Sequence, residues 1–459
     1  ALAEVDEAVL ARYVESEPMS PDWLRSRLAQ HARSGRLFPI MGGSALHNVG
    51  VRALLDAVVS DLPPPKINAG DTLSALVFKV QREPQMGRMA FVRLYGGRIE
   101  SRQSLANATR GGEEKVTQVR KIHAASHADV GAVAAGDIAA LCGLSQAKIG
   151  DVLGDPAGVP GDPRMPEPIL QVKVQPAGGD DHTRLAEALL ELEDEDPALK
   201  VAWNADIREL TVRVMGAVQV EILAALLASR FDLTARFDQP TVIFKETPAG
   251  SGHGFVSYTS IPHWAVMRFA IEPGERGSGV HYTCAVSPRD IKYRYQREVD
   301  RRVPFALQQG PKGWEVTDVR VTLVEGSDHE RHTHPLDFVA ATVWGIEDGL
   351  QNTGTKLLEP ILAFHLSAPA EFGGRIASEL IALRAVFDAP EYRGEFVELR
   401  GEVPAATTLE YPLALRRLTG GRATLDWRLA RYDLAPEAYN DDPAYTQPKR
   451  PWVSFKGFM

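Results

Sequence analysis

The sequence is poor in cysteine and has no long apolar run. Its 459 residues include only two cysteines, Cys142 and Cys284, which lie far apart and suit neither a disulfide framework nor a Cys-x-x-Cys zinc site. The longest apolar candidate, Ala132 to Leu144, is interrupted by Asp137, so no stretch reaches the roughly 18 residues of a spanning helix. No basic region followed by an apolar segment opens the chain. We therefore expect a cytoplasmic protein with no membrane partner.

Signatures of self-contained catalysis are missing as well. A Walker A loop, whose backbone N–H groups surround phosphates, occurs nowhere, so the chain alone cannot hold a triphosphate in that way. No Gly-x-Ser-x-Gly elbow is present. The glycine-rich stretch Gly250 to Gly254 lacks a strand leading into it and a helix after it, so we interpret it as a linker. These absences argue against a self-contained hydrolase.

What remains has ordinary globular composition, with 44% hydrophobic residues, 24% charged residues and a net charge of -9. The length is about three times the roughly 150 residues of one domain, which predicts several domains. The acidic sum argues weakly against a nucleic-acid partner, but local patches decide partner choice. The stretch Arg289 to Arg302 carries six cations against three anions and includes Tyr293 and Tyr295. It fits either a solvated helix face or an RNA-facing surface.

The N-terminal half divides into two patterns. Residues 1–66 combine a helical pattern over Asp22–Ala32, a strand-like run Leu37–Met41 and a helix from Val51, which indicates the end of an α/β domain. Residues 67–160 consist of short strands, and Gly96-Gly97 between two alternating runs predicts a hairpin in a small β-barrel. Five prolines between Asp155 and Pro168 predict a linker.

The C-terminal half repeats one order of elements. Residues 166–248 and 361–442 both show the order βαββαβ, which predicts two ferredoxin-like units. Between them, residues 249–360 form a different α+β pattern, with a long helix predicted over Leu336–Leu358. Residues 443–459 are left as a C-terminal tail.

Three histidines, His329, His332 and His334, lie within six residues. Neutral imidazole is a common transition-metal ligand, but a His-Glu-x-x-His site needs histidine at the position of Thr333, and Pro335 favours a loop. A structural metal, a solvated loop without a role and a polar recognition tip are the three alternatives. Imidazole donates, accepts and stacks, which suits RNA. We favour the recognition tip and assign no metal ligand.

The succession of these parts resembles the translational GTPases of the elongation factor G type. The strings that carry the resemblance are Phe38–Val51, Phe91–Gly97, Asp194–Leu199, Met215–Glu221, Gln239–Pro248, Gln309–Asp318, Gly354–Pro360 and Gln447–Pro451. The last three are most similar to the tetracycline ribosomal protection proteins of that class. The resemblance covers nearly the whole chain.

The resemblance implies a multidomain α/β and α+β fold. The implied parts are a C-terminal remnant of a P-loop GTPase domain (1–66), a β-barrel domain II (67–160), a ferredoxin-like domain III (166–248), an α+β domain IV (249–360), a ferredoxin-like domain V (361–442) and a tail (443–459). In the family, Ser44, Ala45 and Leu46 correspond to the loop that contacts guanine. The P-loop, the switch regions and the Asn-Lys-x-Asp motif are absent from these residues. We therefore expect GTP and Mg²⁺ only in a longer protein, and no GTP hydrolysis by this chain alone.

The resemblance also implies a partner and a site. Such proteins bind the 70S ribosome as monomers, place the tip of domain IV in the decoding region and release tetracycline. The implied drug-displacing loop is His329, Glu330, Arg331, His332, Thr333, His334 and Pro335. Further residues expected to face RNA are Arg276, Arg294, Lys312, Trp314, Lys449 and Arg450.

One departure from the family keeps two alternatives open. The family's loop has a Ser/Pro/Val-rich tip before Pro-Ala-Asp-Phe, whereas this tip is polar and basic before Pro335-Leu-Asp-Phe338. The protein is thus either a tetracycline protection factor or an elongation factor G paralogue in translocation or recycling. A third alternative is a ribosome-binding or metal-binding protein without a GTPase.

Overall fold

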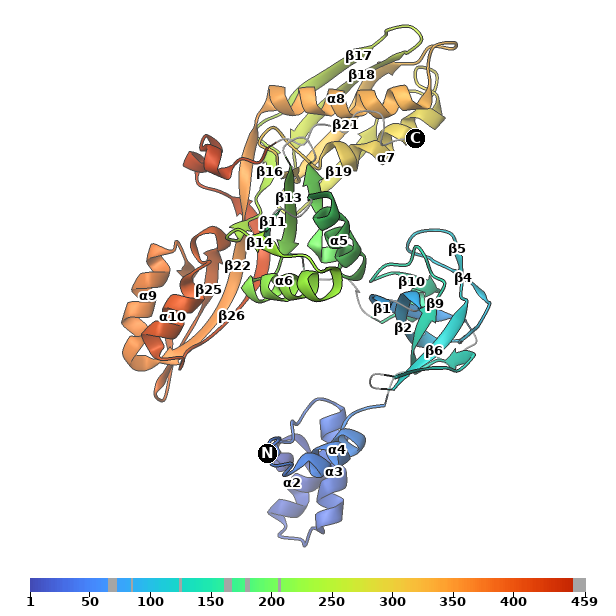
Figure 1. Ribbon diagram of the computed structural model, residues 1–459. Coiled ribbons are helices and arrows are strands. Elements are labelled where there is room, and N and C mark those ends of the chain that lie inside the picture. The colour runs from blue at the N-terminus through green and yellow to red at the C-terminus, as the bar shows by residue number, and fades with distance from the viewer. Residues whose placement is uncertain are drawn as a thin grey trace. The chain divides into compact units, whose positions relative to one another are not determined.

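A computed structural model describes residues 1–64, 72–83, 86–123, 126–160, 167–177, 182–204 and 208–448. The chain separates into two compact units, Ala1–Arg164 and Met165–Met459. Figure 1 shows the helices and strands of both units.

The first unit begins with a helical segment. Its helices are α1 (Leu2–Val5), α2 (Glu7–Val14), α3 (Pro21–Arg33) and α4 (Val51–Asp61). The predicted helix at Asp22–Ala32 is confirmed within α3. The predicted strand at Leu37–Met41 is wrong, because Phe38 and Ile40 are 82% and 97% exposed and no described residue pairs with this run. Apolar residues alone do not make a strand without a neighbouring edge to bond to.

The rest of the first unit is built from short strands around one core. They are β1 (Ser74–Glu83), β2 (Gly87–Gly96), β3 (Arg98–Glu100), β4 (Ser104–Ala106), β5 (Glu113–Lys115), β6 (Gln118–His123), β7 (Ser126–Asp129), β8 (Ala132–Ala134), β9 (Ile138–Cys142) and β10 (Val152–Gly154), followed by the 3-10 helix η1 (Pro156–Gly158). Six of them form a sheet in the order β10-β1-β2-β9-β6-β7. Most of the predicted proline-rich linker follows η1, and its residues 161–166 lie outside the described ranges.

The Gly96-Gly97 hairpin prediction is wrong. Both edges of β2 are occupied, by β1 and by β9, so β3 cannot pair with β2 and pairs with β8 instead. Gly97 has φ +69°, and its left-handed conformation turns the chain out of the six-stranded sheet.

Two parts of the second unit share one topology. The first ferredoxin-like unit contains β11 (Leu170–Pro176), α5 (His182–Glu195), η2 (Pro197–Leu199), β12 (Ala202–Asn204), β13 (Glu209–Val214), α6 (Ala217–Phe231), β14 (Ala235–Phe237) and β15 (Thr241–Val242). The second contains β22 (Thr355–Pro369), η3 (Ala370–Phe372), α9 (Gly373–Ala382), β23 (Val386–Phe387), β24 (Glu391–Arg393), β25 (Phe396–Pro404), η4 (Ala405–Thr407), α10 (Tyr411–Thr419) and β26 (Thr424–Leu434). The sheet orders β12-β13-β11-β14 and β23-β25-β22-β26 confirm both predicted βαββαβ units.

A central block separates them, in which α8 runs along β17 and β18 (Figure 1). Its elements are β16 (Lys245–Pro248), β17 (Gly252–Tyr258), β18 (Ala265–Pro273), β19 (Val280–Cys284), α7 (Tyr293–Ala306), β20 (Glu315–Val316), β21 (Val319–Ser327) and α8 (Pro335–Thr353). The four longer strands form a sheet in the order β17-β18-β21-β19. The chain ends its described part with η5 (Glu437–Asn440) and η6 (Pro443–Tyr445).

Two predictions in the central block need correction. The stretch Gly250–Gly254 is not a linker, because β17 begins within it, and Gly254 lies so close to the Gly345 carbonyl of α8 that a Cβ would collide. The helix predicted over Leu336–Leu358 ends at Thr353, since Gly354 caps it with φ +64° and β22 begins at the next residue.

Among the described residues, no helix has the length and apolar character that crossing a membrane requires.

Candidate nucleic-acid interface

The histidine-bearing loop connects β21 to α8. We call residues His329–Pro335 the tip loop. It adjoins the turn between β17 and β18, because Thr333 and Asp337 both bond to the backbone of Trp264. The predicted recognition residues are therefore held against a second loop that is distant in sequence.

Thr333 anchors the tip loop through hydrogen bonds. Its buried hydroxyl accepts the His329 backbone N–H at 2.7 Å and donates to the Trp264 carbonyl at 2.8 Å. Its own carbonyl accepts the Tyr295 hydroxyl of α7 at 3.2 Å. The residue that breaks the His-Glu-x-x-His pattern is thus the residue that anchors the loop.

Asp337, in the first turn of α8, makes the second anchor. Its buried carboxylate accepts the backbone N–H groups of His334 at 2.8 Å and Trp264 at 3.3 Å. The other carboxylate oxygen lies 2.7 Å from Nδ1 of His263. An acidic side chain at this position also complements the helix dipole.

Aromatic and imidazole rings gather above these anchors. Trp264 and His329 have ring centroids 5.3 Å apart, and His329 and His332 lie 4.7 Å apart. On the other side of the turn, His263 stacks on Tyr258 at 4.9 Å, with planes 14° apart. Such rings offer flat faces to unstacked bases.

The exposed side chains of the tip loop include a cation and hydrogen-bonding groups. Arg331 and His334 are exposed, and within the described part of the chain no ion pair involves the Arg331 guanidinium. Arg294 lies next to the loop through Tyr295, because its guanidinium donates to the Tyr295 hydroxyl at 2.7 Å and stacks on that ring at 4.6 Å. An exposed guanidinium beside such rings, as Arg331 provides, can pair with a phosphate and cover a base.

The rings do not converge on a metal. Across the described ranges no group of three His, Cys, Asp or Glu side chains is arranged to hold an ion. Nδ1 of His329 is engaged within the loop, where it accepts the Arg331 backbone N–H at 3.2 Å. The imidazoles therefore shape the loop itself.

Sequence reasoning missed three members of this site, Tyr258, His263 and Trp264. They lie more than sixty residues before the tip loop, and only β-sheet pairing brings them to it. Their one sequence signal is that three ring-bearing residues, the last of one strand and two in the turn after it, fall within seven positions of the chain.

Other residues expected to face RNA are placed elsewhere. Arg276 bonds to Asp318 and Thr247, both at 3.2 Å. Trp314 is only 5% exposed and donates from Nε1 to the Tyr445 carbonyl at 2.6 Å, and the Lys312 ammonium donates to the Asn440 carbonyl at 2.9 Å. Trp314 therefore exposes little surface to a partner, and the RNA-facing roles of Lys312 and Trp314 stay predictions. Lys449 and Arg450 lie outside the described residues.

A buried carboxylate accounts for the inward fold of this segment. Glu246 of β16 is fully buried and accepts the backbone N–H groups of Lys312 at 3.0 Å and Trp314 at 2.9 Å, and the Thr355 hydroxyl at 2.5 Å. Burial raises the pKa of Glu246, and these hydrogen bonds partly oppose that shift. The segment Gln309–Trp314, here called the junction loop, is folded inward around this group.

The predicted guanine loop forms an exposed turn. Ser44 makes an isolated bridge with Val49 and accepts the His47 N–H at 3.4 Å, and Leu46 is 90% exposed. Ala45 closes the turn by accepting the Asn48 N–H at 3.2 Å. Because the sequence contains no P-loop, these residues by themselves do not fit a GTP site.

Four family models match successive parts of the chain. They are described as elongation factor G domain 2 (residues 72–155), domain III (165–239), domain IV (240–354) and the C-terminus of elongation factor G (356–443). The tip loop and its anchors all fall within the domain IV match.

Individual proteins give the same result. Tetracycline resistance protein TetP of Clostridium perfringens is 31% identical over 441 residues, which cover 96% of this chain and 68% of TetP. Elongation factor G of Thermotoga petrophila is 30% identical over 469 residues, covering 95% and 67%. A crystal structure of a protein from Thermus thermophilus matches 96% of this chain and 68% of its own, with a TM-score of 0.51 and 27% identity.

Proposed function

Because the chain belongs to the elongation factor G family, whose members act on the ribosome, we propose that its tip loop contacts RNA in the decoding region of the small subunit. The contact would combine the Arg331 guanidinium on phosphate with the rings of His329, His332 and Trp264 on unstacked bases. At the level of the family, the chain is a translation factor of the elongation factor G kind.

One observation carries this proposal: the tip loop is fixed before any partner arrives. Thr333 and Asp337 are buried and make hydrogen bonds within the protein, while Arg331 and His334 are exposed. A loop that is already ordered loses little conformational entropy on binding, so its contacts are converted efficiently into affinity.

We propose further that the tip loop releases tetracycline from the ribosome. The similarity to a protein named for tetracycline resistance supports this activity. The identity to that protein is 31%, and the identity to elongation factor G is 30%. A rigid loop that carries rings and a guanidinium is suited to occupying a flat drug site on RNA.

The test measures release of radiolabelled tetracycline from purified 70S ribosomes by the chain. Arg331→Ala with His332→Ala should lower both release and cosedimentation about tenfold, the equivalent of roughly 1.4 kcal/mol for a phosphate and a stacking contact. Arg25→Ala, which removes an exposed cation of α3, is the matched control. Unchanged cosedimentation of the double variant would contradict the RNA contact.

The polar tip favours a second candidate, a translocation or recycling factor. The histidines and Arg331 stand where the family's protection proteins carry a Ser/Pro/Val-rich tip. In this case the chain binds ribosomes with the same affinity at any tetracycline concentration and releases no drug, while the double variant still binds more weakly. Both candidate functions, drug release and translocation or recycling, are proposed here for the tip loop alone. GTP and Mg²⁺ are proposed only for a longer protein that carries a P-loop.

A further inference from the structure

The solvent face of α7 carries a row of arginines that the proposed function does not use. Arg294, Arg297 and Arg301 are all exposed. Because an α-helix turns about 100° per residue, their side chains leave α7 within an arc of about 60°. The helix rises about 1.5 Å per residue, so the row runs for about 10 Å along the axis. We call these three residues the arginine row.

The opposite face of α7 fixes the direction in which the row points. Tyr295, Val299 and Val303 are buried at a spacing of four residues and pack in the core of the central block. The acidic residues of the helix, Glu298 and Asp300, lie on either side of the row and not within it. The row is therefore a continuous strip of positive charge that the packing holds toward solvent.

Little within the protein neutralises this charge. In the part of the chain that the structure describes, Arg294 and Arg297 form no ion pair, since Arg294 donates to the Tyr295 hydroxyl at 2.7 Å and Arg297 lies over a tyrosine ring. Arg301 lies 3.1 Å from Glu298, but its side chain is 66% exposed. An exposed pair of this kind is weak and is readily exchanged for another anion.

Tyr293 adds an exposed aromatic ring to the start of the row. Its ring is 65% exposed, and the Arg297 guanidinium lies 6.0 Å from the ring centroid. A ring with a cation beside it can stack on a base while the cation neutralises a phosphate. Arginine clusters also bind acidic peptides, but a run of carboxylates provides nothing to cover the ring. This combination favours RNA over an acidic protein.

The row begins beside the tip loop. The Arg294 guanidinium donates to the Tyr295 hydroxyl, and that hydroxyl donates to the carbonyl of Thr333, which anchors the tip loop. From this point the row leads away along α7, whose place in the central block Figure 1 shows. A strand that reaches the tip loop can therefore continue along the row.

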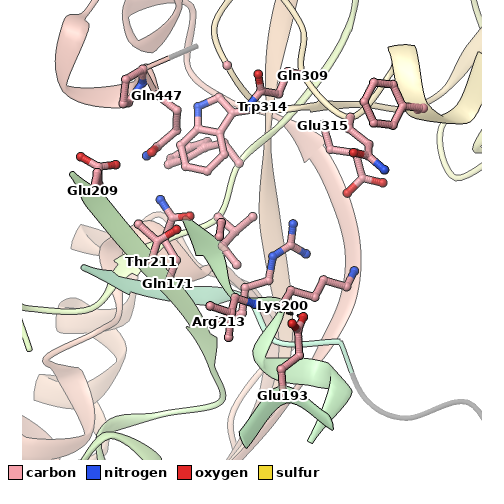
Figure 2. A pocket seen from close by; sticks show the side chains of 18 residues that line it. Gln171, Glu193, Lys200, Glu209, Thr211, Arg213, Gln309, Trp314, Glu315 and Gln447 are labelled. Atoms are coloured by element: carbon pink, nitrogen blue, oxygen red, sulfur yellow. Dashed lines mark hydrogen bonds between the residues drawn. The ribbon is translucent and has the colours of Figure 1, made fainter. Parts of the chain in front are cut away.

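The cations of a nearby pocket do not provide a comparable surface. This pocket of about 480 Å³ is lined by Phe305, close to the end of α7, and by residues that include Lys200 and Arg213 (Figure 2). Lys200 and Arg213 lie 3.2 and 3.5 Å from Glu167. Because a carboxylate of the protein already compensates them, the arginine row is the better suited of the two to a polyanion.

We propose that the arginine row binds the phosphates of an RNA strand that also contacts the tip loop, with Tyr293 stacked on one of its bases. The proposal rests on the proposed function and adds a second contact, which recognises the backbone and not the sequence. Successive phosphates of a helical strand are about 3.4 Å apart along the axis, so the row can face about three of them. Because the net charge is -9, the attraction comes from this local strip and not from the chain as a whole.

The experiment measures anisotropy of a fluorescent single-stranded RNA of mixed sequence, about 12 nucleotides long, as the complete chain is added at several salt concentrations. For single strands, each phosphate contact contributes about 0.7 to the slope of log K against log salt. Arg297→Gln with Arg301→Gln should therefore reduce the slope by about 1.4 and weaken binding at least tenfold at about 0.1 M salt. Arg294 is left unchanged, because it also supports Tyr295.

Two control variants separate charge from structure. Arg297→Lys with Arg301→Lys keeps both charges and should keep the wild-type slope, since neutralising a phosphate depends on charge. Arg25→Gln with Arg52→Gln removes two exposed cations from α3 and α4 and should leave both slope and affinity unchanged.

Three results would overturn the inference. They are a wild-type chain that shows no salt-dependent RNA binding, identical slopes for wild type and the glutamine variant, and equal affinity for a polyglutamate peptide of the same charge. The last result would make the row a site for an acidic protein.

The proposed function is tested separately, by Arg331→Ala with His332→Ala on 70S ribosomes. If the row variant binds RNA as wild type does while the tip variant no longer cosediments with ribosomes, the arginine row is refuted and the tip loop stands. The opposite pattern supports the arginine row and refutes the tip loop alone.

Discussion

The tip loop and the junction loop are both short, polar connections of the central block, yet they are built in opposite ways. The tip loop takes its hydrogen bonds from Thr333 and Asp337, which belong to the same stretch of chain and lie beneath it. The junction loop takes its bonds from Glu246, which lies on another strand and draws the backbone around itself. In the tip loop, the anchoring residues lie between the loop and the core, so the other side chains of the loop stay exposed. In the junction loop, the backbone wraps around the anchoring carboxylate, so the Trp314 side chain is buried.

This difference shows that the position of the hydrogen-bond acceptor decides which surface a loop presents. Lysine and tryptophan are residue types that often contact RNA. In the junction loop, however, the side chains of Lys312 and Trp314 bond to the C-terminal segment of the same chain. The comparison predicts that changes in the junction loop alter stability, whereas changes at the tip alter binding. Four experiments test that division.

The largest effect is expected from Glu246→Ala. It leaves two buried backbone N–H groups and a hydroxyl without an acceptor and opens a cavity, which together should cost about 3 kcal/mol of unfolding free energy. Urea unfolding of the complete chain measures it. Glu275→Ala, at an exposed position of the central block, serves as control and should change stability by less than about 0.5 kcal/mol.

Asp337→Ala should have the next largest effect and should change both properties. Loss of the carboxylate frees the backbone N–H groups of His334 and Trp264 and unpairs His263, at a cost of about 2 kcal/mol. Because the tip loop is then no longer fixed, ribosome cosedimentation should also fall. Stable protein with wild-type cosedimentation would show that the anchor is not needed for binding.

Arg331→Ala alone should leave the unfolding free energy within about 0.5 kcal/mol of wild type, since its side chain is exposed. Its effect should appear only in ribosome binding, where the salt dependence loses the contribution of about one phosphate contact. Cosedimentation at two or more salt concentrations measures that slope. An identical slope in wild type and variant would argue against a phosphate partner for Arg331.

The smallest effect concerns pH. The pKa of Glu246 is raised in the folded chain, so the folded state holds this proton more tightly than the unfolded state does. The resulting stabilisation is complete below the unfolded pKa of 4.5 and is lost as the pH rises through the raised folded value. Compared with Glu246→Gln, which does not titrate, wild type should therefore lose stability as the pH rises above 4.5. Parallel pH profiles of the urea midpoints would refute this assignment.

The sequence predicted the repeated ferredoxin-like units and the family correctly, because both rest on local periodicity and on the order of many elements. Predictions failed where a distant partner decides the outcome. The Gly96-Gly97 turn joins unpaired strands because β9 already occupies β2, and Gly254 lies in a strand because α8 passes close to it. The burial of Trp314 also depends on a distant partner, Glu246, which precedes it by 68 residues.

The candidate site was predicted in part. The sequence located the tip loop, because three histidines are conspicuous in a short segment. It did not locate Tyr258, His263 and Trp264, whose proximity depends on the register between β18 and β21. Nor did the sequence identify Thr333 as the anchor, since a threonine hydroxyl gives no signal until its acceptor is placed.

The single strand β22 has a mechanical consequence. Its first residues pair with β16 of the central block, and it continues without interruption into the ladders with β25 and β26. The predicted boundary at residue 360 falls inside it. Bending the central block away from the second ferredoxin-like unit at this boundary would therefore require breaking backbone hydrogen bonds of β22, because the chain has no unpaired hinge there.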